Sequence, residues 1–331
     1  MSLLRAGFKP VFDLNFYQTN WTLTDHCNYH CSYCVNKHKR TGGFSLAREI
    51  MLRTLDNLRA TDKDQFFFAL EGGESTLYKH LDEMLEHISS IFADKRHFVR
   101  IISNGSATVS RMRELLDTCD NSMFIITLHL EQINLENTLE KLLSLREKAG
   151  RFLVKLLIAP GKLREGKEAV DGLRASGFSN FRILHTLDFM TGMVDPCYAP
   201  EEMEAIAALR DQHSEKEYFV FFNEYSLPGG GTREERFTQT EGVQTGLFNY
   251  QNMFCAAGSC SIKISPDGSF ARTGYCGDMP YSLKDKNPFA DPAFTTPLRC
   301  PNPSCICVAY AKLPKWREDA AAPAWLRREQ V

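Results

Sequence analysis

The sequence lacks the features that mark membrane, secreted and nucleic-acid-binding proteins. No run of about eighteen apolar residues occurs in its 331 residues, which predicts that no helix crosses a membrane. The first ten residues contain no apolar stretch of the kind that precedes a signal cleavage site, so we expect a cytoplasmic protein. The net charge is only −2, without the basic excess that drives binding to phosphate backbones, and we expect no nucleic-acid partner.

The chain does contain enough apolar material for a large folded body. Hydrophobic residues make up 43% and aromatic residues 11% of the sequence, which argues against long disordered segments. The length exceeds one typical domain but fits a single large α/β body with an appended module. Because the later sequence is rich in cysteine, proline and aspartate, we expect two domains, residues 1–213 and residues 214–331.

Strand-like and helix-like segments alternate through the first of these parts. The expected strands are residues 20–24, 65–71, 98–103, 123–128, 152–158 and 180–184. The expected amphipathic helices between them are residues 45–59, 79–92, 108–118, 135–148 and 164–175. Right-handed crossovers would curl six such units into a partial (β/α)6 barrel of the TIM type. Since the loops after the strands surround one cavity, we expect the chemistry there.

Eleven cysteines, an odd number, fall mostly into two groups, which favours metal binding over a disulfide framework. The first group, Cys27, Cys31 and Cys34, has the spacing C-x3-C-x2-C and directly follows the first expected strand. Three thiolates can hold a 4Fe–4S cube and leave one iron open to another molecule. The alternative is a zinc knuckle. Its fourth ligand would be His26, His30 or His38.

This loop resembles the signature of the radical S-adenosylmethionine (SAM) enzymes, and the resemblance extends over roughly residues 20–190. In that family the open iron binds the amino and carboxylate groups of SAM, and an electron from the cluster cleaves SAM to a 5′-deoxyadenosyl radical. That radical abstracts hydrogen from the substrate. The resemblance therefore implies an enzyme with a 4Fe–4S cluster and SAM as cofactors, and a one-electron donor such as flavodoxin or ferredoxin as a partner.

The resemblance also implies which residues contact SAM. Tyr33, the aromatic residue before the third cysteine, is placed to contact the adenine. Gly72, Gly73 and Glu74 follow the second strand, where the family carries a Gly-Gly-Glu segment beside the methionine amino group. Ser75 stands where the family often has proline, a departure that affects loop stiffness. Taken alone, a Gly-Gly pair is also typical of an ordinary turn.

Polar residues near the ends of later strands complete the candidate site. Ser103 and Asn104 resemble the family's contact to the ribose or carboxylate of SAM, although the same residues are typical of a turn or helix cap. His129 and Lys155 lie on the fourth and fifth expected strands. Both are candidate substrate contacts if they point into the barrel, and ordinary core or solvated residues if they do not.

A second group of cysteines lies in the later part of the chain, around a hairpin that the turn sequence Pro266-Asp267-Gly268 predicts. Its members are Cys255, Cys260, Cys276, Cys300, Cys305 and Cys307. The group resembles the auxiliary-cluster domain called SPASM, or its shorter relative called twitch. That resemblance implies one auxiliary 4Fe–4S cluster, with the first three cysteines favoured as ligands, and the surplus thiols leave room for a second. A structural zinc ribbon is the alternative.

Two cysteines lie outside both groups. Cys119 is expected to be a buried apolar residue at the end of a helix. Cys197 is a candidate hydrogen-atom donor, which would return hydrogen to a substrate radical and make the reaction an epimerisation.

These features predict a radical SAM enzyme of the oxidoreductase or epimerase type. The substrate we expect is a small polar molecule such as a sugar, an aminocyclitol or a nucleotide-linked saccharide. The alternative is maturation of a ribosomally made peptide or protein. Because only 26 residues precede Cys27, too few for a peptide-recognition domain, the small molecule is favoured. An alternative of another class is a zinc-stabilised binding protein without catalysis.

Overall fold

Parallel strands form the main sheet of the protein. The computed structural model describes residues 2–9, 15–34, 43–186, 194–213, 220–237, 242, 245–273, 281–302, 305 and 311–317. Within these ranges the main sheet has the strand order β13-β12-β11-β2-β3-β4-β5-β6-β7. Its strands are β2 (Phe16–Thr22), β3 (Gln65–Glu71), β4 (Arg96–Ser103), β5 (Ser122–His129), β6 (Phe152–Ile158), β7 (Phe181–His185), β11 (Ser261–Ile264), β12 (Ser269–Ala271) and β13 (Tyr281–Ser282).

Helices connect the parallel strands β2 to β7, which pair in chain order. They are α1 (Arg48–Arg59), α2 (Leu81–Ile91), α3 (Val109–Thr118), α4 (Leu135–Leu143) and α5 (Leu163–Ala175), with 3-10 turns η1 (Ser75–Leu77) and η2 (Arg146–Arg151), and α6 (Pro200–His213) follows β7. Side chains of Thr108 and Asn134 cap the first turns of α3 and α4. No helix among the described residues is long and apolar enough to span a bilayer.

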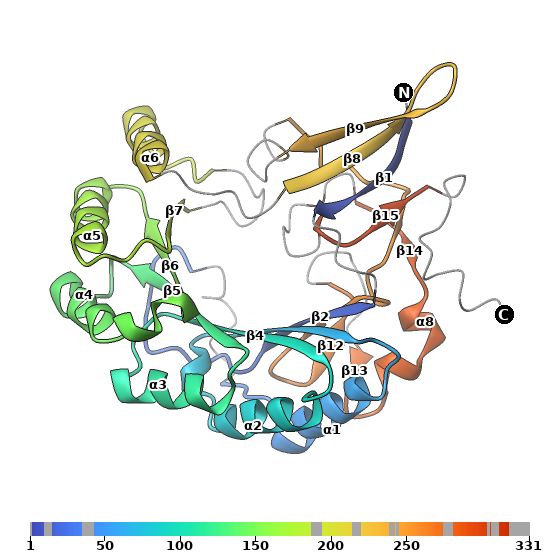
Figure 1. Ribbon diagram of the computed structural model, residues 1–331, viewed down its shortest axis with the longest axis horizontal. Helices are drawn as coiled ribbons and strands as arrows, with labels where there is room; N and C mark the ends of the chain where they lie inside the picture. Colours follow the sequence, from blue (N-terminus) through green and yellow to red (C-terminus); the bar gives the residue numbers. More distant parts are fainter. Residues whose placement is uncertain are drawn as a thin grey trace.

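Alternation along the strands decides which face of the sheet is covered. In β6, Phe152, Val154, Leu156 and Ile158 are fully buried in the core, whereas Lys155 between them points to the other face. Figure 1 shows α1 to α5 along the outer, convex side of the curved sheet. The inner, concave side is therefore left for polar side chains and for a ligand.

A second sheet lies across from the concave side of the first (Figure 1). In the described residues its order is β14-β10-β15-β1-β8-β9. These strands are β1 (Ser2–Lys9), β8 (Val220–Ser226), β9 (Thr232–Phe237), β10 (Phe254–Cys255), β14 (Leu298–Arg299) and β15 (Lys315–Trp316). The described residues of this part also contain two short helical turns, η3 (Pro288–Ala290) and α8 (Pro292–Thr295).

The predicted fold class, an α/β parallel barrel with an appended cysteine-rich region, is confirmed. The six expected strands correspond to β2–β7. The five expected helices correspond to α1–α5, and the end of the fourth expected helix falls in the turn η2. β2 begins at Phe16, four residues before the expected 20, because its apolar residues continue backwards along the chain. The hairpin expected at Pro266-Asp267-Gly268 joins β11 to β12, with Gly268 at a φ of 84° that favours glycine.

The two sheets exchange strands across the boundary expected at residue 214. β1, at the start of the chain, pairs with β8 and β15 in the second sheet. β11, from the later part, pairs in parallel with β2 and extends the barrel sheet. Sequence periodicity reports which face of a strand is apolar but not which distant strand it will pair with. The division into two independent domains stays a prediction.

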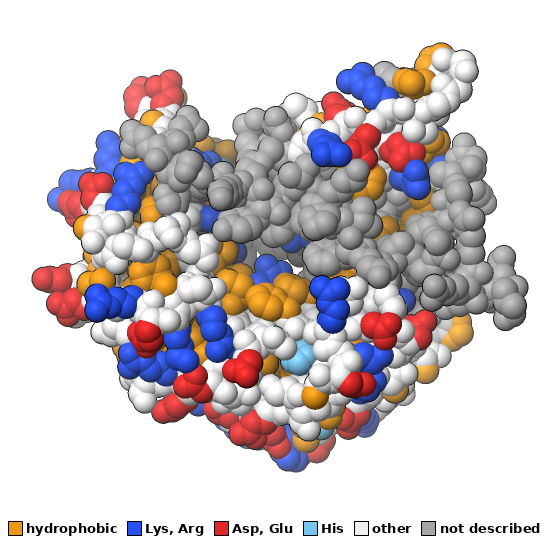
Figure 2. All heavy atoms as spheres, in the orientation of Figure 1, with side chains coloured by type: hydrophobic (Ala, Val, Ile, Leu, Met, Phe, Trp, Pro, Cys, Tyr) orange, Lys and Arg blue, Asp and Glu red, His pale blue; other side chains and the backbone are white. Residues whose placement is uncertain are grey.

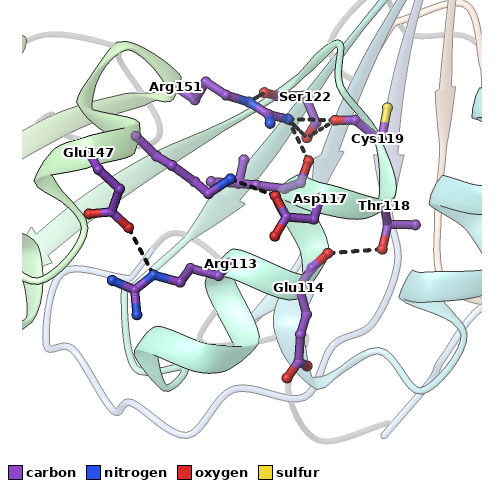
Figure 3. Close-up of polar contacts among 10 residues, drawn as sticks. Arg113, Glu114, Asp117, Thr118, Cys119, Ser122, Glu147 and Arg151 are labelled. Carbon is purple, nitrogen blue, oxygen red and sulfur yellow. Dashed lines mark hydrogen bonds and ion pairs between the residues drawn. The ribbon is translucent and has the colours of Figure 1, made fainter.

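Arg151, directly before β6, links the end of α3 to the start of β5 through hydrogen bonds. It donates hydrogen bonds to the carbonyl oxygens of Leu116 at 2.7 Å, Cys119 at 2.5 Å and Ser122 at 2.9 Å. Figure 3 shows its guanidinium between Cys119 and Ser122, where α3 ends and β5 begins. The carbonyl of Cys119 also accepts from the N–H and the hydroxyl of Ser122, so the arginine adds a charged donor to a turn that is already hydrogen-bonded.

Cys119 lies in this same turn and is 1% exposed, as expected for a buried apolar residue. Two ion pairs flank the turn, Lys148 to Asp117 at 2.5 Å and Arg113 to Glu147 at 2.9 Å. Both are largely exposed and contribute little to stability.

Replacing Arg151 with methionine should lower the free energy of unfolding by about 2 kcal/mol, because several partly buried carbonyls lose a charged donor. The measurement is chemical denaturation. Arg146→Met is the matched control, since Arg146 is exposed, and it should leave stability unchanged. An equal loss in both variants would contradict this role for Arg151.

Candidate active site at the barrel mouth

A loop that directly follows β2 carries Cys27, Cys31 and Cys34. All three are free thiols; Cys31 is buried and the other two are partly exposed. The backbone N–H of Cys34 donates to the carbonyl of Cys31 at 3.2 Å, and the N–H of Tyr29 points to the sulfur of Cys27 at 3.4 Å. The expected position of this cysteine group, at the carboxyl end of the first barrel strand, is the position that the structure gives it.

The Gly-Gly-Glu segment after β3 lies directly against the backbone of this loop. The N–H of Gly73 donates to the carbonyl of Thr24 at 2.8 Å, and the N–H of Glu74 donates to that of His26 at 2.7 Å. A Cβ on Gly72 would lie 2.6 Å from the Thr24 oxygen, and one on Gly73 would fall on the backbone of His26. Both positions therefore require glycine for a close backbone approach.

Glu74 connects the loops after β3 and β4. It is only 1% exposed, and its carboxylate accepts hydrogen bonds from the hydroxyls of Ser103 at 2.8 Å and Thr76 at 2.6 Å and from the N–H of Asn104 at 2.6 Å. A buried carboxylate with these donors is well satisfied. The side chains of Glu74 and Ser103 thus bind one another. The expected contacts of Glu74 and Ser103 to SAM stay predictions.

Asn104 extends from the end of β4 to the cysteine loop. Its amide nitrogen donates to Asn28 at 2.9 Å and lies 3.8 Å from the sulfur of Cys27. Donors that point at a cysteine sulfur are one of the means by which proteins tune an iron–sulfur cluster. Ser103 and Asn104 are both expected at the site; Asn104 lies beside Cys27, a candidate ligand of the cluster, whereas Ser103 binds Glu74.

The end of β5 holds the other side of the cysteine loop. Glu131 accepts from the backbone N–H of Ser32 at 2.8 Å and from its hydroxyl at 2.5 Å. The ring of His129 stacks on Tyr33 with centroids 5.9 Å apart, and its Nδ1 is 3.1 Å from the Tyr33 hydroxyl. The two residues predicted to contact different ligands, Tyr33 and His129, therefore lie side by side.

The surroundings of Cys31 disfavour its thiolate form. Burial, together with the nearby sulfur of Cys34, raises the pKa of Cys31 to about 11. Burial, and the charge of Cys31 after it, raises the pKa of Tyr33 well above its usual value. Because thiolates are the metal-binding form, a bound cation is needed to stabilise them, which fits an iron–sulfur cluster on these sulfurs. Across the described residues, no three Cys, His, Asp or Glu side chains are placed to share a single metal ion.

A recess that is partly open to solvent brings together members of the second cysteine group. Cys255, Cys300 and Cys305 line it, and fully buried Cys260 packs in the same apolar cluster as Cys255. Burial raises the pKa of Cys260 to about 12 and, less strongly, that of Cys300. Cys276 and Cys307 lie outside the described residues. Four of the six expected ligands are thus gathered in one region.

Three cations also line this recess, namely Arg272, Arg299 and Lys315. Lys315 is 2% exposed; its ammonium donates to the carbonyls of Ala311 and Leu313 and sits 4.7 Å from the ring centre of Tyr250. Burial raises the pKa of Cys300 and the charge of Lys315 partly offsets this, so the donor set and its surroundings fit a thiolate-bound cluster.

Lys155 and Cys197 are the remaining predicted site residues. Lys155 is on the concave face of β6, paired with Arg182 on β7. Sequence reasoning missed Arg182 and also Arg100 on β4, although each lies between two buried strand residues, a pattern that marks an inward charge. Cys197 is exposed, and its N–H donates to Asp195 at 2.9 Å. Its role as hydrogen donor stays a prediction.

Changing Gly73 to alanine should displace the cysteine loop, because the new methyl group would occupy the space of the His26 backbone. We expect a loss of about 2 kcal/mol of stability and reduced iron and sulfide after anaerobic reconstitution. The matched control is Gly150→Ala, where a Cβ meets open space. Wild-type iron content and stability in Gly73→Ala would show that the close approach is not needed.

Comparisons with known proteins agree with this geometry. The model of the radical SAM superfamily matches residues 21–208. The fold is similar to native anSMEcpe with bound AdoMet and Kp18Cys peptide (12% identity, 83% of this chain and 80% of that chain covered, TM-score 0.58). It is also similar to Streptococcus suis SuiB bound to the precursor peptide SuiA (13% identity, 83% of this chain and 64% of that chain, TM-score 0.57).

At these identities the structural likeness shows the shared fold alone. No curated protein sequence matches the chain. The family match, however, spans more than half of the 331 residues and includes the cysteine loop and β3 to β7. The chain therefore belongs to the radical SAM superfamily, whose enzymes use a 4Fe–4S cluster and SAM as cofactors.

Proposed function

We propose that Cys27, Cys31 and Cys34 bind three irons of the cluster and leave the fourth iron for SAM. The observation that carries this proposal is the bracing of the cysteine loop, which follows β2 and is held by residues after β3, β4 and β5. When bound, the cluster and SAM supply a 5′-deoxyadenosyl radical that abstracts a hydrogen atom from the substrate. The residues of the chain hold these groups in place at the barrel mouth.

The residues around the loop divide into those that face the ligand and those that position others. We assign the backbone of Gly72 and Gly73 and the ring of Tyr33 to SAM. Glu74 and Ser103 act by fixing the loops, because their side chains bind one another. We assign Asn104 to the cluster, because its side-chain amide points at the sulfur of Cys27. It also stands next to the expected SAM site.

The substrate is a small polar molecule, in which hydrogen abstraction is followed by oxidation or epimerisation. The charged inner face of the barrel supports this, because Lys155 and its cationic neighbours suit a polar ligand better than an apolar one. Oxidation removes one further electron and a proton from the substrate radical. Epimerisation instead returns a hydrogen atom, for which Cys197 is the candidate donor. The electron that starts the reaction comes from a donor such as flavodoxin or ferredoxin.

Peptide modification is the second candidate. It is favoured by the bound molecules of the similar structures, since anSMEcpe is seen with a Kp18Cys peptide and SuiB with its precursor peptide. The two candidates predict different substrates but the same first step at the barrel mouth. Deuterium transfer from a labelled substrate into 5′-deoxyadenosine would separate them.

We further propose an auxiliary 4Fe–4S cluster in the recess of the second cysteine group. Cys255, Cys260, Cys300 and Cys305 are the described candidates for its ligands. This ligand set differs from the one favoured by the sequence, which includes Cys276. Such a cluster would accept the electron that oxidation of the substrate radical releases.

Replacing Cys31 with alanine should abolish SAM cleavage, because one of three sulfurs around the cluster is lost. The measurement is 5′-deoxyadenosine released by anaerobically reconstituted, dithionite-reduced protein. Cys119→Ala is the control, since Cys119 is buried under α3 outside both groups, and it should release wild-type amounts. Undiminished 5′-deoxyadenosine from Cys31→Ala would contradict the assignment.

Replacing Cys255 with alanine should reduce iron content but leave some SAM cleavage, because it removes a ligand of the auxiliary cluster only. Iron and sulfide analysis together with 5′-deoxyadenosine release measures both effects. If this variant loses all cleavage yet keeps its full iron content, the proposed separation of the two centres is wrong.

A further inference from the structure

Tyr250 is buried beside the second cysteine group. Its side chain is 0% exposed and packs in one apolar cluster with Cys300 and Cys305. The ring lies 6.2 Å from the ring of Phe248, and the ammonium of Lys315 sits 4.7 Å from its centre. Lys315, Cys300 and Cys305 also line the recess in which we place the auxiliary cluster. Tyr250 therefore packs directly against residues that line this recess.

Backbone hydrogen bonds tie the chain around Tyr250 to two of the candidate ligands. The N–H of Cys305 donates to the carbonyl of Phe248 at 2.9 Å, and the N–H of Cys300 donates to the carbonyl of Met253 at 2.7 Å. Tyr250 lies between these two contacts in the sequence. Its place relative to both cysteines is thus fixed by the backbone on either side of it.

Strands of the second sheet separate the ring from solvent. The hairpin of β8 and β9 carries charged side chains of both signs on its surface (Figure 2). The last residue of β9, Phe237, is instead 3% exposed, and its ring lies 5.5 Å from that of Phe248. Ala6 of β1 belongs to the same apolar cluster. A polar atom in such surroundings needs a partner inside the protein or on a bound group.

The hydroxyl of Tyr250 has no hydrogen-bond partner in the described part of the chain. Tyr78, which is 1% exposed, shows the usual arrangement, because its hydroxyl donates to the carbonyl of Leu46 at 2.9 Å. Burial, and after it the charge of Cys305, raises the pKa of Tyr250 well above its usual value, so the hydroxyl keeps its proton. It is a buried donor that calls for an acceptor.

We infer that the Tyr250 hydroxyl donates a hydrogen bond to a sulfur atom of the auxiliary cluster. A cluster held by thiolates is rich in negative charge, and a donor to its sulfurs favours the reduced, more negative state. This inference rests on the proposed auxiliary cluster. Tyr250 thereby raises the affinity of that cluster for one electron, the electron that the substrate radical loses together with a proton when it is oxidised.

An ordered water is the other possible partner of the hydroxyl. The side-chain oxygen of Asn223 is also buried and has no donor among the described residues. The amide nitrogen of Asn223 donates to the carbonyl of Leu247 at 2.9 Å, in the segment that leads to Tyr250. A water bound to both oxygens would leave the cluster without this donor. The two partners therefore predict different reduction potentials when the hydroxyl is removed.

Tyr250→Phe removes only the hydroxyl. The test uses the full-length chain in which alanine replaces the three cysteines of the first group, so that after anaerobic reconstitution only the auxiliary cluster is present. A redox titration followed by electron paramagnetic resonance measures its reduction potential. We expect the potential of Tyr250→Phe to fall by about 59 mV, which is a tenfold weaker affinity for one electron.

Tyr78→Phe, made in the same chain, is the matched control. It removes a buried hydroxyl that is already paired with Leu46 between the barrel helices, and it should leave the potential of the auxiliary cluster unchanged. Equal potentials in Tyr250→Phe and in the parent chain would overturn the inference and favour the bridging water. Equal shifts in both variants would overturn it as well.

A second measurement detects the hydrogen bond itself. Electron–nuclear double resonance of the reduced cluster in D₂O should show an exchangeable deuteron that is coupled to the cluster and is lost in Tyr250→Phe. If Tyr250→Phe holds no cluster, the parent chain alone decides, and a spectrum without any exchangeable deuteron overturns the inference.

Failure of this inference is distinguishable from failure of the proposed function. If the chain without the first cysteine group retains no iron, the proposed auxiliary cluster is wrong and the inference falls with it. If that chain retains a cluster whose potential does not depend on Tyr250, the auxiliary cluster stands and only the inference is overturned.

Discussion

The backbone of residues 72–74 lies directly against the backbone of residues 24–26, and the arrangement of the barrel mouth depends on this contact. Two hydrogen bonds and two glycines allow the approach, and the buried carboxylate of Glu74 extends it to the end of β4. These contacts hold the start of the cysteine loop in place without a bound metal. Its three thiols need only be ionised, not gathered from a disordered segment.

The barrel mouth and the concave face of the sheet carry different ionisable groups. At the mouth, sulfurs and carboxylates lie close together, and burial raises the pKa of the Cys31 thiol. On the concave face of the sheet, Arg100, Lys155 and Arg182 point inward, and burial lowers the pKa of Arg100 and of Lys155.

Much of this could be predicted from the sequence because it is local. The spacing of Cys27, Cys31 and Cys34, the Gly-Gly-Glu segment and the alternation of strands and helices each lie in short stretches, and the parallel barrel is confirmed. The pairing of Tyr33 with His129 and the satisfaction of Glu74 by Ser103 could not be predicted, since they join loops about 30 to 100 residues apart. The same holds for β1, whose partners β8 and β15 are set by tertiary contacts.

The pairing of β11 with β2 has a consequence for how the chain is made. β2 is among the first strands to leave the ribosome, yet the neighbour that covers its outer edge is residues 261–264. Until those residues emerge, the edge of β2 presents unpaired backbone groups to solvent, and these groups can pair with a strand of another chain. The barrel is therefore completed late in synthesis, and a fragment ending before β11 would be aggregation-prone even with every cysteine of the first group present.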